Sequence, residues 1–266
     1  MTNELVLLKL GGSLITDKDK PYTPRLDKLK ELAQEIKAAQ DSDPGLLLIL
    51  GHGSGSFGHV AAKKHGTRDG VHTREEWLGF TEVRYQAAEL NRHVLQSLLE
   101  AGIPAMPFPP SASMVSDKRK VVHHNVEAIR KALAAHLLPV VQGDVAFDET
   151  LGGTILSTED VFTFLIDQFP AKRILLAGIE DGVWGDFPAR TRLVKQIQLS
   201  DYEAMRNGIQ GSASTDVTGG MKAKVEEMLA LIQNHKELTV QIFSAEKEGL
   251  LTRALRGENV GTLLTV

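Results

Sequence analysis

The sequence predicts an α/β protein with an open, mostly parallel sheet. Short apolar runs that are typical of buried strands alternate with longer segments of helical spacing along most of the chain. Strands that alternate with helices favour a parallel sheet with helices on both faces. The chain of 266 residues contains no linker that clearly divides it. We therefore expect one compact domain with two closely packed lobes.

In the first part of the chain each apolar run is followed by a helical stripe. Leu5–Leu10 is apolar apart from one lysine and indicates a strand, and Leu46–Leu50 indicates another. Leu26–Ala39 between them has helical spacing. Trp77–Ala101 is predicted to be a long helix, because its apolar residues recur every three or four positions. This stripe consists of Val83, Ala87, Leu90, Val94 and Leu98.

The middle of the chain continues the alternation with two interruptions. Pro104–Pro107 is the next strand candidate, and a proline-rich turn, PFPPSAS, overlaps its end. A helix near Val126–His136 and a strand at Leu137–Gln142 follow. Gly143–Ile155 and, later, Gly182–Leu199 break the alternation, and we expect them to form hairpins beside the sheet.

The remaining segments complete the pattern. Helices are predicted near Ser157–Asp167, Gly219–Gln233 and Glu246–Leu255, and strands at Arg173–Ala177, Thr239–Phe243 and Gly261–Val266.

Composition and charge place the chain among ordinary globular proteins. Hydrophobic residues make up 42% and charged residues 24%, and a net charge of −4 gives no reason to expect nucleic acid or an anionic membrane as a partner. The absence of cysteine excludes disulfides, thiolate metal sites and a cysteine nucleophile. Neither a secretion signal nor a run long enough to span a membrane is present, so we expect a cytoplasmic protein.

The stretch GHGSGSFGH at 51–59 follows a predicted strand and leads into a helix. Its glycines Gly53, Gly55 and Gly58 have the G-x-G-x-x-G spacing of a dinucleotide-binding turn. Such a site also needs an acid at the end of a second strand, about 20 residues further on. The only acids near that count lie in polar sequence without a strand. A Rossmann site is therefore not expected.

The same stretch is also not a P-loop. The two positions after the last glycine hold His59 and Val60, where a P-loop needs lysine and serine or threonine. What remains is a glycine turn at a helix N-terminus, which suits an anion because its backbone N–H groups are unpaired. His59 stands where it can donate to a phosphate oxygen, and a histidine satisfied by backbone groups is the alternative.

A second glycine turn, in KLGGSLITDK, ends the first predicted strand. It places Lys9, Gly11, Gly12 and Ser13 at the junction and Lys18 shortly after. Adjacent parallel strands would bring both glycine turns to the same carboxyl edge, where ligands of such sheets usually bind. One turn would then hold the donor phosphates and the other the acceptor. An exposed loop charge is the alternative for Lys18.

Two further segments carry charges at predicted helix starts. In TDVTGGMKAKV, Gly219 and Gly220 precede a helix with Lys222 and Lys224 in its first turns. A lysine there works against the helix dipole, which favours a nearby anion over a merely solvated side chain.

In ILSTEDVFTFLI, Ser157 or Thr158 can cap a helix, and Glu159 and Asp160 suit its N-terminus. An acid at this place could also orient lysines across the site.

Taken together, these motifs resemble the amino acid kinase superfamily and, within it, the isopentenyl phosphate kinases. The resemblance runs from KLGGS at 9–13 to GTLL at 261–264. GSFGH is its most specific element, and GFTEV, GIPAMPFPPS, QGDV, ILSTED and DVTGGM also fit, in this order. It implies an open αββα-type sandwich in a single domain over 1–266, with an acceptor lobe over about 1–170 and a nucleotide lobe over about 171–266.

The resemblance implies transfer of the γ-phosphoryl group of ATP to isopentenyl phosphate, with Mg²⁺ and in a homodimer. The alternatives are a fosfomycin kinase or another small phosphate or phosphonate kinase, and a non-catalytic nucleotide-binding module. A pocket that extends beyond His59 with apolar walls would favour the prenyl acceptor, whereas a closed polar pocket would exclude it. Phe80, Val83 and Tyr85 are candidates for its wall, with ordinary core packing as the alternative.

The resemblance also implies roles for residues at matching positions. Catalytic roles are implied for Lys9, Lys18, His59 and Asp160. Nucleotide binding is implied for Lys9, Gly11, Gly12, Ser13, Gly55, Asp181, Gly220 and Lys224. Acceptor binding is implied for Ser54, Gly55, His59, Gly143 and Thr158, and no protein ligand for the metal is assigned.

Three of these roles are more specific. Lys18 would stabilise the transferring group, His59 would bind the acceptor phosphate, and Asp160 would organise the site lysines. The chain departs from the family where Ser54 and Thr158 replace frequent glycines. It also departs where Ile179 replaces the first acid of the nucleotide segment.

The adjacent histidines His123 and His124 have no partners at metal-ligand spacing. We expect them to form a polar lead-in to a helix and not a metal site.

Overall fold

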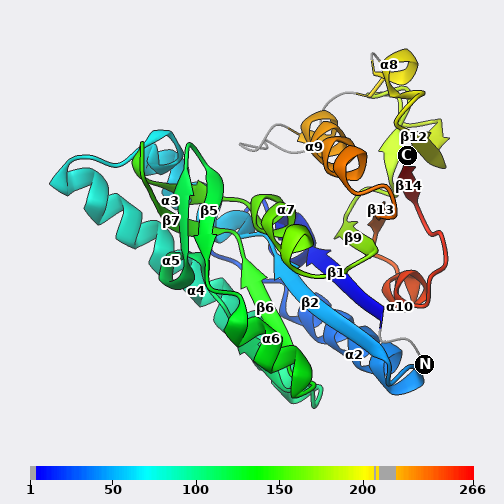
Figure 1. Cartoon of the computed structure of the whole chain (residues 1–266), viewed down its shortest axis with the longest axis horizontal. Coiled ribbons are helices and arrows are strands. Elements are labelled where there is room, and N and C mark those ends of the chain that lie inside the picture. The colour runs from blue at the N-terminus through cyan, green and yellow to red at the C-terminus, as the bar shows by residue number, and fades with distance from the viewer. Residues whose placement is uncertain (1–3, 207, 210–219) are drawn as a thin grey trace.

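One large sheet organises the computed structural model, which describes residues 4–206, 208–209 and 220–266 (Figure 1). Its strands are β1 (Glu4–Leu10), β2 (Leu46–His52), β3 (Ala105–Pro107), β6 (Leu138–Gln142), β9 (Arg173–Gly178), β12 (Gln196–Gln198), β13 (Thr239–Ser244) and β14 (Thr262–Thr265). They lie in the order β12-β14-β13-β9-β1-β2-β6-β3. Neighbours are parallel except β13 and β14. The predicted α/β class and mostly parallel sheet are confirmed.

Helices cover both faces of this sheet. One face carries α2 (Leu26–Ser42), α4 (Arg74–Glu100) and α10 (Leu250–Leu255). The other face carries α6 (Glu127–Ala134), α7 (Thr158–Gln168) and α9 (Gly220–Asn234). Because successive side chains of a strand point to opposite faces, β1 contributes to both cores. Val6 and Leu8 are fully buried with the first set of helices, and Leu5 and Leu7 are buried with the second.

A smaller sheet stands beside the main one. Its strands are β4 (Met114–Asp117), β5 (Lys120–His124), β7 (Asp144–Asp148) and β8 (Gly152–Leu156), in the order β5-β4-β7-β8. The hairpin predicted at Gly143–Ile155 is confirmed as β7 and β8, and the one at Gly182–Leu199 as β10 (Val183–Trp184) with β11 (Leu193–Val194). The sequence analysis did not predict β4, β5 or β12. Figure 1 shows the small sheet next to α3 (Gly55–His65) and α4.

The remaining helices are short: α1 (Gly12–Ile15), α5 (Pro110–Ser113), α8 (Tyr202–Met205) and a 3₁₀ turn at Thr67–Asp69. Within the part of the chain that the structure describes, no helix has the length and apolar character needed to cross a bilayer.

Two predictions about local structure were wrong. His123 and His124 lie on strand β5, and not on a lead-in to a helix, because the segment pairs antiparallel with β4. The helix predicted to begin at Glu246 begins at Leu250. The residues before it form a loop after β13, in which the N–H of Glu246 donates to the hydroxyl of Ser244 at 3.2 Å.

Candidate active site

The two predicted glycine turns lie against each other at the carboxyl edge of the sheet. β1 and β2 are parallel neighbours, and the N–H of Gly53 donates to the carbonyl of Leu10 at 3.0 Å. A Cβ atom added to Gly12 would lie 2.5 Å from the backbone nitrogen of Gly55, so no larger residue fits there without movement. The predicted juxtaposition of the turns is therefore confirmed.

Backbone N–H groups converge where the turns meet. Among the described residues, the N–H groups of Gly12, Ser13, Ser54 and Gly55 have no hydrogen-bond acceptor. α3 begins at Gly55, so the positive end of its dipole lies at the same place. Unpaired N–H groups and a helix N-terminus together form a site that suits phosphate.

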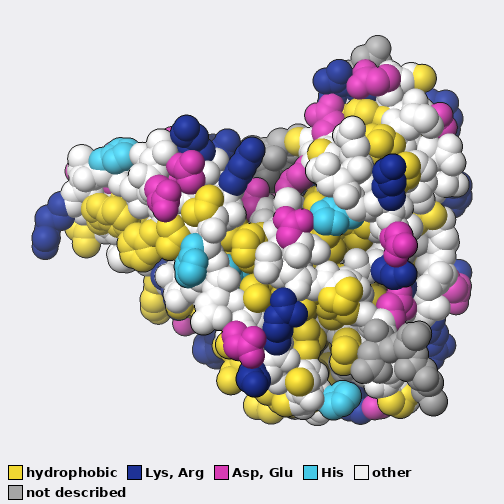
Figure 2. All heavy atoms as spheres, in the orientation of Figure 1, with side chains coloured by type: hydrophobic (Ala, Val, Ile, Leu, Met, Phe, Trp, Pro, Cys, Tyr) yellow, Lys and Arg dark blue, Asp and Glu magenta, His cyan; other side chains and the backbone are white. Residues whose placement is uncertain are grey.

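A cavity of about 860 Å³ lies over this edge. The predicted site residues that line it are Lys9, Gly11, Gly12, Ser13, Lys18, Ser54, Gly55, His59, Gly143, Thr158 and Lys224. In Figure 2 the surface is notched between the part that carries α4 and the part that carries α9. The fold thus gathers residues from β1, α3, α7 and α9 around one space.

Three predicted site residues are not part of this lining. Within the described ranges, Asp160, Asp181 and Gly220 do not contribute to it, and Asp181 is exposed. Gly219, which the sequence analysis placed beside Gly220, lies outside the described residues. On the nucleotide segment the cavity is lined instead by Ile179 and its neighbour Glu180.

A buried ion pair joins the first strand to α7. The ammonium group of Lys9 donates to the Glu159 carboxylate, and the two side chains are 12% and 7% exposed. Burial by itself raises the pKa of Glu159, but the nearby charges of Lys9 and Lys224 outweigh it and hold this pKa below its ordinary value. Glu159 is therefore ionised at neutral pH, and its negative charge interacts with both lysines.

The acid that pairs with Lys9 is Glu159, which corrects the prediction for Asp160. The Asp160 carboxylate accepts hydrogen bonds from the N–H and the hydroxyl of Ser157, each at 2.7 Å. The N–H of Asp160 in turn donates to the Ser157 hydroxyl at 3.0 Å, which completes a capping box. This capping geometry occupies Asp160 and leaves Glu159 to pair with Lys9.

Glu227 of α9, which the sequence analysis did not identify, is not part of the cavity lining but interacts electrostatically with Lys9, Lys224 and Glu159. It lies one helical turn from Lys224, on the same side of α9. Burial, together with the charges of Glu159 and Asp160, raises its pKa to about 7, although Lys9 and Lys224 act in the opposite direction. The three-residue spacing from Lys224 was the available signal.

His52 connects the strand ends beneath the cavity. Its carbonyl accepts from the Thr158 hydroxyl at 2.7 Å and from the N–H of Gly143 at 3.0 Å. Its ring Nε2 lies 3.0 Å from Oδ1 of Asn91, and burial lowers its pKa, so the ring is neutral. The Thr158 hydroxyl is therefore occupied by the hydrogen bond to the His52 carbonyl, although Thr158 also lines the cavity.

Apolar side chains line the same cavity as His59. These are Val60, Ala62, Val83, Ala87 and Ile155, and the charged residues Lys63, Arg68 and Asp69 also line it. Of the three candidates for an apolar wall, Val83 lines the cavity, whereas Phe80 is buried in the core beside it and Tyr85 is 61% exposed.

Comparisons of the sequence and of the structure with known proteins agree on one family of kinases. The model of the amino acid kinase family matches residues 4–244. The chain is 33% identical over 267 residues to the isopentenyl phosphate kinase of Methanocaldococcus jannaschii, with 97% of each chain covered. It is 34% identical over 274 residues to that of Methanothermobacter thermautotrophicus, covering 98% of this chain and 99% of the relative. A solved isopentenyl phosphate kinase structure superposes with a TM-score of 0.82 at 30% identity, covering 98% of this chain and 100% of that one.

Replacing Gly12 tests the contact between the turns. Gly12→Ala should lower the free energy of unfolding by about 1–3 kcal/mol, because the new Cβ forces the two backbones apart. Urea unfolding measures the change. Gly178→Ala is the matched control, since a Cβ there meets nothing within 4 Å. Equal midpoints for Gly12→Ala and the wild type would show that the turns are not in contact.

Glu227→Gln tests the raised pKa. Above the ordinary carboxyl value of 4.5 the unfolded chain loses a proton that the folded chain keeps up to about 7, so Glu227 lowers stability as pH rises through this window. Glu227→Gln should therefore match the wild type near about pH 4 and be more stable near about pH 8. Urea unfolding across pH measures this, with the exposed Glu248→Gln as charge-matched control. A pH-independent difference would contradict the assignment.

Proposed function

The chain belongs to the amino acid kinase family, and from this we infer that the protein transfers the γ-phosphoryl group of ATP to isopentenyl phosphate, giving isopentenyl diphosphate and ADP. The family match over residues 4–244 and the full-length similarity to isopentenyl phosphate kinases support this reaction.

The observation that carries the choice of acceptor is the set of apolar side chains that line the same cavity as His59. Val60, Val83 and Ile155 would provide a wall for a hydrocarbon tail. A fosfomycin-sized acceptor has no use for such a wall. A non-catalytic module is not favoured either, because Lys9, Lys18 and Lys224 all line the cavity.

The reaction needs positioning and positive charge more than covalent help. An oxygen of the acceptor phosphate forms a bond to the γ-phosphorus while the bond to the β–γ bridging oxygen breaks, and ADP leaves with that oxygen. The acceptor phosphate is already an oxyanion near neutral pH, so no strong general base is required. The work of the protein is to align the two phosphates and to offset their charge.

We propose that the two turns divide this work. The N–H groups of Gly12 and Ser13, next to Lys9, would face the donor phosphates, with Gly11, Gly220, Asp181 and Lys224 on the nucleotide side. Ser54 and Gly55 would hold the acceptor phosphate, with His59 donating to it and Gly143 and Thr158 beside it. Lys18 would reach the transferring group. Glu159 would orient Lys9, a role that its buried ion pair supports.

The proposed metal is Mg²⁺, which we assign to the ATP phosphates. No group of three acidic or imidazole side chains able to hold a metal ion occurs among the residues that the structure describes. Mg²⁺ usually keeps several waters and binds substrate phosphates with few protein ligands. When bound, it would offset charge on the donor phosphates, and we assign no step to a protein ligand of the metal.

We also propose an acceptor lobe over about 1–170 and a nucleotide lobe over about 171–266, a homodimer and a cytoplasmic location, in line with the family resemblance.

The reaction is tested by measuring ADP release with isopentenyl phosphate, dimethylallyl phosphate and fosfomycin. The prenyl phosphates should be turned over, with isopentenyl phosphate the better substrate or equal to dimethylallyl phosphate. Turnover of fosfomycin alone would overturn the acceptor assignment, and no turnover with any of them would overturn the kinase function.

His59→Ala should weaken use of the acceptor. Loss of a charge-assisted hydrogen bond costs about 1.5–3 kcal/mol, so kcat/KM for isopentenyl phosphate should fall more than about tenfold while KM for ATP changes little. Steady-state kinetics measure both constants. His123→Ala, an exposed histidine of β5, is the matched control. An unchanged kcat/KM for the acceptor would remove His59 from the acceptor site.

A further inference from the structure

Lys18 lies on an exposed loop, yet the base of that loop is fixed. The Lys18 loop, residues 16–25, connects α1 to α2. Its two sides are joined across the base, where the N–H of Asp17 donates to the carbonyl of Thr23 at 2.9 Å. A lysine on a flexible stem needs such a fixed base if its ammonium group is to act at one place.

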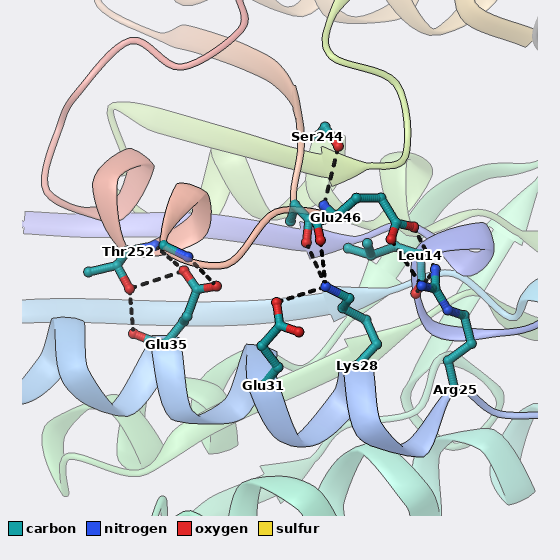
Figure 3. A network of polar contacts seen from close by, with 10 residues as sticks. Leu14, Arg25, Lys28, Glu31, Glu35, Ser244, Glu246 and Thr252 are labelled. Carbon is teal, nitrogen blue, oxygen red and sulfur yellow. Dashed lines mark hydrogen bonds and ion pairs between the residues drawn. The ribbon is translucent and has the colours of Figure 1, made fainter.

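Arg25 ties this base to the segment after β13. Its N–H donates to the carbonyl of Ile15 at 2.8 Å, and its Nη1 donates to the carbonyl of Leu14 at 3.1 Å. The guanidinium also contacts both carboxylate oxygens of Glu246, at 2.5 and 2.9 Å (Figure 3). A bidentate pair of this kind fixes orientation as well as distance.

Glu246 is itself held in place. Its carbonyl accepts from the ammonium group of Lys28 at 2.9 Å, and Lys28, which is 8% exposed, also pairs with Glu31 at 2.7 Å (Figure 3). The Arg25 contact holds the pKa of Glu246 below its usual value. Further along α2, the Glu35 carboxylate accepts from the N–H of Thr252 at 2.8 Å. α2 is thus joined to the β13–α10 segment at several points.

The opposite side of the Lys18 loop is anchored on α3. The rings of Tyr22 and Phe57 meet edge to face with centroids 5.9 Å apart. Tyr22 has a φ of 52°, in the left-handed region that disfavours a bulky residue, so its position is fixed by its surroundings. The loop is therefore held between α3, which begins at Gly55, and the segment that follows β13.

We propose that Arg25 is a positioning residue for Lys18. By joining the base of the Lys18 loop to Glu246, it places the Lys18 ammonium group over the cavity, at the point where the phosphoryl group moves between donor and acceptor. This rests on the proposed function, in which Lys18 contacts the transferring group. Arg25 itself does not line the cavity.

Kinetics of three variants test the coupling. Arg25→Met should lower kcat at least about tenfold and leave KM for ATP within about threefold, because only the placement of Lys18 changes. Arg25→Lys should recover part of the loss. Adding Arg25→Met to Lys18→Ala should cause no further loss, because its effect passes through Lys18. The matched control is Arg253→Met on α10, which breaks an exposed 2.7 Å pair with Glu258.

Amide hydrogen exchange gives a readout that does not depend on activity. Exchange at the N–H of Asp17 should be faster in Arg25→Met than in the wild type and unchanged in Arg253→Met, while urea unfolding shows that each variant is folded. An unchanged exchange rate at the N–H of Asp17 would overturn the anchoring of the loop by Arg25, independently of which reaction the protein catalyses.

The kinetic outcomes separate this proposal from the proposed function. A wild type without turnover would overturn the reaction. Wild-type kcat in Lys18→Ala would overturn the role of Lys18 and, with it, the positioning by Arg25. Two outcomes would overturn the positioning alone. One is a reduced kcat in Lys18→Ala together with a wild-type kcat in Arg25→Met. The other is a double variant in which the two reductions in kcat multiply.

Discussion

The close approach of two backbones at Gly12 and Gly55 is the constraint on which the site depends. Side chains are excluded at this contact, so the unpaired N–H groups of both turns face the same space. The parallel pairing of β1 with β2 brings the two turns together. The His52 carbonyl at the end of β2 also accepts hydrogen bonds from Gly143, which follows β6, and from Thr158 of α7. Two phosphates held by these turns would lie side by side, which is the arrangement that direct transfer needs.

Local sequence patterns predicted the main sheet, its helices and the two turns, because each depends on residues close together in the chain. They failed for β4 and β5, which are short and partly polar: β5 pairs with β4, and β4 pairs with β7. The choice between Glu159 and Asp160 was also wrong, since both acids suit a helix start and only the capping geometry separates them. The pair of Arg25 with Glu246 joins residues 221 positions apart, and no local pattern indicates it.

Electrostatics in the cavity depend on carboxylates as much as on lysines. A protein of net charge −4 must assemble its positive site locally, and the lysines do this beside Glu159 and Glu227. Glu159 pairs with Lys9, and the charge of Lys224 also lowers the pKa of Glu159. Burial and the charges of Glu159 and Asp160 raise the pKa of Glu227 to about 7. The arrangement keeps several cations near one another before any phosphate is bound.

The position of β1 also bears on how the protein folds. β1 pairs on one side with β2, which follows soon in the sequence, and on the other side with β9, which lies far along the chain. During synthesis the β1–β2 pair and both glycine turns can assemble early, whereas the second edge of β1 stays unpaired until β9 has been made, and β13 then pairs with β9. A nascent chain therefore carries half of its site next to an open strand edge, which makes this stage the one most exposed to wrong strand pairing.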